Sequence, residues 1–202
     1  MKRTKVISAV AFIALLGACN TVGTTRNAPL EQLPQSSLPQ VGAGIKSTQS
    51  ISWRVQDVRV NIPDELSVSE ANLYLPGSDI VWREDPHGDR REQVKTIIDL
   101  AVSQAAMSLN GQDPVYLDIN LKRFHALSQK ARATVGGQHT ITFEVVIRDV
   151  ETNVDLIDPF PVEIKLKAYG GQKAIDAEMR GETQKVRITR EITSVMRQYL
   201  GM

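Results

Sequence analysis

Alternating apolar and polar residues predict most of a β-sheet. The two-residue period is that of a strand with one buried face. Four segments carry it: Ser52–Ile62, Val115–Ala126, His139–Arg148 and Val162–Ala168. In the first segment the apolar positions change phase near Gln56-Asp57, which indicates a β-bulge. Leu73–Leu75 and Ile80–Trp82 are short apolar runs, and we expect each to form a short strand.

Two other segments carry the helical period. Apolar residues recur three or four positions apart over Val94–Leu109 and again over Ile188–Tyr199, as on the buried face of an amphipathic helix. Asp89 and Thr183 precede these segments and have the side-chain oxygen that an N-cap requires. We therefore expect two helices that pack against the sheet.

The order of these elements predicts the fold class. Strands that follow one another in hairpins, together with two helices, indicate an α+β domain. We expect an antiparallel or mixed sheet of about four to five strands with two helices packed on one face. We also expect a loop or flexible strand edge over Ser128–Gly137, a hairpin loop over Asp149–Asn153 and a broken helical turn at Ala174–Met179.

The first residues form an export signal. A basic start with Lys2, Arg3 and Lys5 is followed by the apolar run Val6–Gly17 and then by small residues, the three parts of a secretory leader. The run is shorter than the roughly 20 apolar residues that a spanning helix needs. We expect residues 1–18 to be cleaved as a signal peptide.

The end of this leader resembles the lipobox of bacterial lipoproteins. It reads Leu16-Gly17-Ala18-Cys19, with Asn20 after the cysteine. The resemblance implies that a lipid is attached to the Cys19 thiol, that the chain is cut before it, and that the new amine is acylated. Several acyl chains hold a protein firmly to a membrane. By the sorting rule of enteric bacteria, Asn20 implies the outer membrane, facing the periplasm, with the inner membrane as the alternative.

A linker composition separates the lipidated cysteine from the domain. Residues 19–50 are rich in Thr, Gly, Pro, Gln and Ser and show no apolar period, so we expect a disordered tether. The alternative is an ordered segment wrapped over the domain, docked through Ile45 and Ile51. Residues 51–202 are of a size for one domain. Because Cys19 is the single cysteine, this domain has no disulfide and no thiol chemistry.

Charge argues against nucleic acid as a partner. The chain has 24 Lys and Arg against 23 Asp and Glu, and removal of Lys2, Arg3 and Lys5 leaves 21 against 23, a net charge of −2. Proteins that bind nucleic acid neutralise phosphates with clustered cations. We expect no nucleic acid partner for the processed protein.

Motifs for catalysis or cofactors do not appear in the sequence. The histidines His87, His125 and His139 lack the spacing of metal ligands, and we expect each on the surface or in a turn. No nucleophile elbow, P-loop or dinucleotide fingerprint occurs. We therefore expect a protein that is not an enzyme and that uses no metal and no cofactor.

The richest group of charged residues lies before the first helix, over Asp79–Arg91. Trp82, Arg83, His87 and Arg90 are candidates for a surface that binds a partner or an anionic ligand, because a helix N-terminus and arginine side chains both attract anions. The alternative is a solvated loop whose charges pair locally.

Residues of this loop also carry a family resemblance. Over most of residues 51–202 the chain resembles an uncharacterised family of alphaproteobacterial lipoproteins, and in architecture it resembles the auxiliary lipoproteins of ABC-type transport systems. The residues concerned are Asp79-Ile80-Val81-Trp82-Arg83, Asp85-Pro86-His87-Gly88-Asp89-Arg90 and Arg148-Asp149-Val150-Glu151-Thr152. The resemblance implies no known activity. We expect an accessory or adaptor protein of an envelope complex; the alternative is a carrier of a small apolar molecule or lipid.

Overall fold

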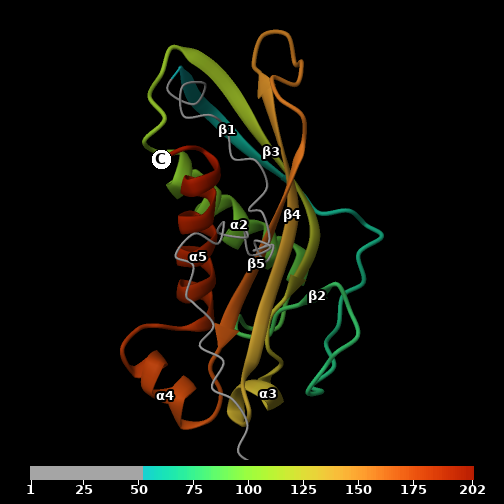
Figure 1. Cartoon of the computed structure of the whole chain (residues 1–202). Helices are drawn as coiled ribbons and strands as arrows, with labels where there is room; N and C mark the ends of the chain where they lie inside the picture. The colour runs from blue at the N-terminus through green and yellow to red at the C-terminus, as the bar shows by residue number, and fades with distance from the viewer. Residues whose placement is uncertain (1–51) are drawn as a thin grey trace, which may run out of the picture. The chain divides into compact units, whose positions relative to one another are not determined.

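The computed structural model describes residues 52–202 (Figure 1). The predicted leader, the lipidation site Cys19, the tether and residue 51 lie outside the described residues. In chain order the elements are β1 (Trp53–Asn61), β2 (Ile80–Val81), α2 (Arg90–Ala106), β3 (Asp113–His125), α3 (Gln129–Ala133), β4 (Gly137–Asp149), β5 (Phe160–Ala168), α4 (Gln172–Met179) and α5 (Gln184–Tyr199).

The five strands form one mixed sheet. Its order is β1-β3-β4-β5, and the short strand β2 pairs with β3 beyond the end of β1. Strands β1 and β2 run parallel to β3, whereas β3–β4 and β4–β5 are antiparallel pairs. The parallel pairs require a crossover, and α2 supplies it. The predicted α+β class with a mixed sheet is confirmed.

Strand register explains the change of phase in the first apolar pattern. The pairing of β1 with β3 shifts between Val55 and Asp57, which confirms the predicted bulge. The shift lets Trp53 and Val55 before it, and Val58 and Val60 after it, all belong to the core side of the sheet. Without the bulge, one of the two groups would point into solvent.

Two helices cover one face of the sheet. In Figure 1, α2 and α5 lie side by side across the strands, and the apolar residues of both helices join the inward residues of the sheet in one core. Fully buried members include Ile98, Ile119, Phe143 and Ile192. This arrangement confirms the prediction of two helices packed on one face.

The helices α2 and α5 run in the same direction. Thr193 of α5 meets Ala101 of α2, and four residues later Arg197 meets Gln104. Both helices begin at the end of the sheet where β2 and β3 finish, since each carries the chain back along the sheet. A shallow channel between two parallel helices is the result, and it lies on the side away from the strands.

The predicted caps are present. The Asp89 side chain accepts hydrogen bonds from the backbone N–H groups of Arg91 and Glu92, at 2.9 and 3.3 Å. The Thr183 hydroxyl accepts one from the N–H of Val186 at 3.3 Å. Each cap satisfies donors that a helix leaves without a partner in its first turn.

Three local predictions were wrong or incomplete. Leu73–Leu75 is not a strand, and Leu75 is 87% exposed. The predicted loop Ser128–Gly137 contains α3, because the Ser128 hydroxyl caps the N–H of Ala131 at 3.1 Å. The broken turn at Ala174–Met179 is the complete helix α4. Short apolar or polar runs do not determine their own conformation, and tertiary packing decides it.

Candidate functional site

The charged loop before α2 is fixed from the inside by Trp82. Its indole is fully buried, lies edge-on to Phe124 with 5.8 Å between ring centres, and donates a hydrogen bond from Nε1 to Asp85 at 2.8 Å. The sequence made this tryptophan a candidate for a surface that binds a partner. In the structure it lies in the core.

Arg90 is the second interior residue of this loop, with only 5% of its surface exposed. Its Nε donates to Glu70 at 2.6 Å. Its Nη1 donates to the carbonyl oxygens of Asp85 and Pro86, each at 3.0 Å, and to the side chain of Gln93 at 2.7 Å. A guanidinium with all these partners is a structural clamp for the loop.

Glu70 joins this clamp to Arg83, which also donates a hydrogen bond to the same carboxylate. The hydrogen bond from Arg90 lowers the pKa of Glu70 below its usual value, and the charges of Arg90 and Arg83 act in the same direction. Sequence reasoning missed Glu70, which lies 20 residues before Arg90 in a segment without regular structure.

The four candidate residues of this loop therefore do not share one surface. Trp82 and Arg90 are interior, Arg83 is partly exposed and bonded to Glu70, and His87 is exposed. The alternative interpretation, in which the charges pair locally, describes what the structure shows for the two arginines.

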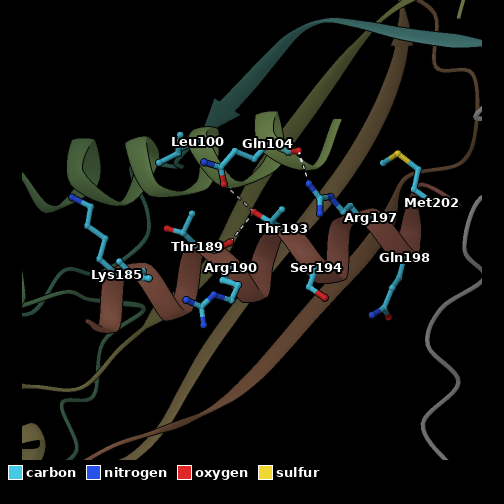
Figure 2. A pocket seen from close by; sticks show the side chains of 11 residues that line it. Leu100, Gln104, Lys185, Thr189, Arg190, Thr193, Ser194, Arg197, Gln198 and Met202 are labelled. Carbon is cyan, nitrogen blue, oxygen red and sulfur yellow. Dashed lines mark hydrogen bonds between the residues drawn. The ribbon is translucent and has the colours of Figure 1, made fainter. Parts of the chain in front are cut away.

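A groove of about 750 Å³ runs along the outer side of α2 and α5. Figure 2 shows that α5 provides most of its side chains and that Leu100 and Gln104 of α2 form the opposite wall. The residues from α5 and the chain end are Lys185, Val186, Thr189, Arg190, Thr193, Ser194, Arg197, Gln198 and Met202. On α5 they recur as adjacent pairs every four residues, which places them on one helix face.

The floor of this groove is held by Thr193. Its hydroxyl is directed at the carbonyl oxygen of Thr189 in its own helix, at 2.9 Å (Figure 2). It also lies 3.0 Å from the carbonyl oxygen of Ala101 in α2. Arg197 reaches across to the carbonyl oxygen of Gln104 at 3.4 Å. These contacts fix the spacing of the two helices and keep the groove open.

The groove is positively charged. Its lining side chains include Lys185, Arg190 and Arg197 and no aspartate or glutamate. Lys185 pairs with Asp85 at 3.0 Å and Arg190 lies 3.6 Å from Glu182. Arg197 has no acidic partner within residues 52–202. The cations at 190 and 197 are seven residues apart, a signal present in the sequence, but the wall from α2 could be identified only from the fold.

His139 corrects the expectation that all three histidines lie at the surface or in turns. It is fully buried on β4, and neither ring nitrogen has a hydrogen-bond partner in the described part of the chain. Burial lowers the pKa of His139 to about 3, with smaller contributions in the same direction from Arg187 and His125. The ring is therefore neutral at physiological pH and acts as a core side chain.

The face of the sheet opposite α2 and α5 carries a separate group of charges around Asp118. This carboxylate accepts two hydrogen bonds from Arg59, at 2.5 and 2.7 Å, and lies 3.0 Å from Arg148. Arg148 also contacts Asp155 at 3.0 Å. These charges pair with one another across neighbouring strands.

Two further observations concern only residues 52–202. No group of three or more His, Cys, Asp or Glu side chains is arranged to hold a metal ion there. No helix in that range has the length and apolar character needed to cross a membrane.

Comparison with known proteins gives a family match over the whole described domain. DUF6778, a family of unknown function, matches residues 53–202. No curated protein matches the chain.

Three solved structures are similar to the chain at low sequence identity. The first is a Xanthomonas campestris protein of the DUF330 family, with 12% identity, a TM-score of 0.43 and coverage of 74% of this chain and 82% of that one. The second is a Caulobacter crescentus CB15 protein assigned as a lipoprotein. It has 10% identity and a TM-score of 0.30, and the match covers 77% of this chain and 95% of that one. The third is a PelC dodecamer from Paraburkholderia phytofirmans. It has 10% identity and a TM-score of 0.32, and the match covers 71% of this chain and 86% of that one. At these TM-scores no activity is carried over.

Proposed function

Because the chain belongs to the DUF6778 family of unknown function, we propose its role from its own residues: it is a lipoprotein of the bacterial envelope that acts as a non-enzymatic adaptor. Its lipid is attached at Cys19, and the tether of residues 19–50 holds the α+β domain in the periplasm. The outer membrane is the proposed location, with the inner membrane as the alternative. The anchor rests on the sequence Leu16-Gly17-Ala18-Cys19 that follows an apolar leader.

The groove between α2 and α5 carries the adaptor role. It is an open surface lined by long cationic side chains and by exposed Leu100, Val186 and Met202. Exposed apolar groups beside charged ones are typical of surfaces that bind another macromolecule. We propose that the partner is a component of an envelope complex.

The groove gives less support to a carrier of apolar molecules. Such a protein encloses its ligand in a mostly apolar cavity, and in this fold that cavity would lie between the helices and the sheet. That region is filled by fully buried side chains such as Ile98, Phe143 and Ile192. The groove lies on the other side of the helices and has hydroxyl and amide groups along its floor.

The anchor is tested by replacing the one thiol. We expect wild-type protein to incorporate labelled palmitate and to sediment with membranes, and Cys19→Ala to do neither. Cys19→Ser gives a near-isosteric control that also lacks the thiol. Palmitate labelling of Cys19→Ala would contradict the proposal, since residues 1–202 contain no other cysteine.

A further inference from the structure

We infer that the groove between α2 and α5 binds an acidic amphipathic helix of a partner protein. The inference rests on the proposed adaptor function and names the chemistry of the partner. It is carried by three properties of the groove: the sign of its charges, the position of its apolar residues, and its concave shape between two parallel helices.

The charges of the groove favour an anionic occupant, because Arg197 has no acidic partner within residues 52–202 and the lining cations outnumber the lining acidic side chains. Lys185, Arg190 and Arg197 line the groove without an aspartate or glutamate side chain among the lining residues. Two of them have an acid nearby, Asp85 and Glu182, and each of these acids lies outside the lining. Opposite charges across an interface guide association and select the partner.

The spacing of the cations fits a helix. Arg190 and Arg197 are two helical turns apart, which is about 10 Å along α5 at 1.5 Å per residue. Acidic residues seven positions apart on a partner helix have the same separation. From Lys185 to Gln198 the groove extends along α5 for about 20 Å, the length of a helix of about 14 residues.

Apolar residues supply the second half of the recognition. Leu100, Val186 and Met202 are 48%, 40% and 42% exposed, and all three line the groove. Figure 2 shows the small hydroxyl side chains of Thr189 and Thr193 directed toward α2, where they form the floor between the two helices. Small floor residues let a helix approach closely, while its apolar face packs on the exposed anchors.

A lipid surface fits this geometry less well. A flat bilayer would touch the rims of the groove and leave its floor empty. A single anionic lipid carries its charge in one headgroup, whereas Lys185 and Arg197 are twelve residues apart on α5, about 18 Å at 1.5 Å per residue. A polyanionic carbohydrate would satisfy the cations and leave Leu100, Val186 and Met202 without apolar partners.

Photocrosslinking in cells that make the full chain tests the inference. We would place p-benzoylphenylalanine at Thr189 and Ser194 in the groove, and at Glu163 on the exposed side of β5 as a position outside it. We expect protein adducts from both groove positions. Mass spectrometry of each adduct should identify a partner segment that has acidic residues seven apart and a helical apolar period.

Charge reversal supplies the matched control. We expect Arg190→Glu with Arg197→Glu to lower the adduct yield at least tenfold. Lys95→Glu with Lys122→Glu changes the net charge equally at exposed positions outside the groove and should leave the yield within twofold. Equal melting temperatures of the two double variants would show that both are folded.

The outcomes separate this inference from the proposed function. A groove adduct with lipid, carbohydrate or a non-acidic segment, or one insensitive to the reversal at 190 and 197, overturns the acidic helix. Protein adducts from Glu163 alone overturn the groove as the binding surface and retain the adaptor. Absence of protein adducts at all three positions contradicts both.

Discussion

The ammonium group of Lys185 lies 3.0 Å from the carboxylate of Asp85, a residue one hundred positions earlier in the chain. The same carboxylate accepts the indole N–H of Trp82, and the neighbouring Glu84 accepts the backbone N–H of Lys185 at 2.6 Å. The loop that follows β2 is therefore fastened to the first turn of α5. The Lys185 end of the groove is therefore held in place by Asp85, which is itself bonded to the buried Trp82.

Glu70 is expected to stabilise the domain in a pH-dependent manner. Glu70→Gln removes the charge that Arg90 and Arg83 contact, and because the Glu70 side chain is 41% exposed we expect a loss of only about 1 kcal/mol at pH 7. The pKa of Glu70 is lowered in the folded protein, so its contribution is complete above the unfolded value of 4.5 and is lost as the pH falls through the folded value.

Urea unfolding of wild type and Glu70→Gln at pH 7, 5 and 3 measures this effect. The difference in the free energy of unfolding should shrink below pH 4.5. The exposed Glu151 gives a control, since Glu151→Gln should change stability by less than about 0.5 kcal/mol. A difference for Glu70→Gln that does not change with pH would contradict the proposed role of its charge.

His139 is expected to weaken the domain in mild acid. The unfolded chain takes up a proton near pH 6.5, whereas the pKa of folded His139 is about 3. Stability should therefore fall as the pH drops below 6.5, by about 2 kcal/mol between pH 7 and pH 5 from this group. His139→Leu removes two buried nitrogens that lack partners, so we expect it to stabilise the protein by about 1 kcal/mol at pH 7.

Thermal unfolding of His139→Leu across this pH range checks both statements. Its loss of stability from pH 7 to pH 5 should be smaller than that of wild type. His87→Gln, at an exposed position, should retain the wild-type slope. A His139→Leu variant with an unchanged slope would show that His139 is not the group responsible.

Gly170 is expected to tolerate no side chain. A Cβ at this position would overlap the backbone of Gly136 and Val135, where two loops cross without space between them. We expect Gly170→Ala to lower the free energy of unfolding by at least about 2 kcal/mol. Gly77→Ala meets no atom within 4 Å and should be neutral. Equal stability of the two variants in chemical denaturation would argue against this close approach.

Thr193 is expected to hold α2 and α5 together through its hydroxyl. Thr193→Val keeps the shape and removes the donor to Ala101, so we expect a loss of about 1 kcal/mol. Thr193→Ser keeps the hydroxyl and should retain the hydrogen bond at the cost of one methyl group. Hydrogen exchange of α2 and α5 amides would locate the effect. If valine and serine weaken these helices equally, the hydroxyl is not what joins them.

The elements predicted correctly from the sequence are those with a long periodic pattern of apolar residues. Val94–Leu109 showed its helix by period and cap, and the change of phase near Gln56-Asp57 located the bulge that the pairing with β3 confirms. The expectation that His139 lies at the surface was wrong. Histidine is a polar residue type, but His139 occupies the same alternating positions of the strand as the buried Ile141 and Phe143. That alternation was the available signal for its burial.

The candidate site was harder to predict, because it depends on contacts between distant segments. Trp82 and Arg90 were identified in a charged loop, but their burial results from Phe124 and Glu70, which come from β3 and from an irregular segment. The groove likewise requires Leu100 of α2 beside α5. No local period in the sequence indicates which two helices will be neighbours.

The mixed pairing of β3 sets an expected order of folding. The antiparallel partners β4 and β5 are the next two strands after β3 in the chain, so this three-stranded meander closes through the connections 126–136, which contains α3, and 150–159. Strand β1 reaches β3 only across more than fifty residues, as the pairing of Val55 with Val115 shows. Closing that long loop costs more entropy. We expect the meander to form first, so that one edge of β3 stays exposed until β1 pairs with it.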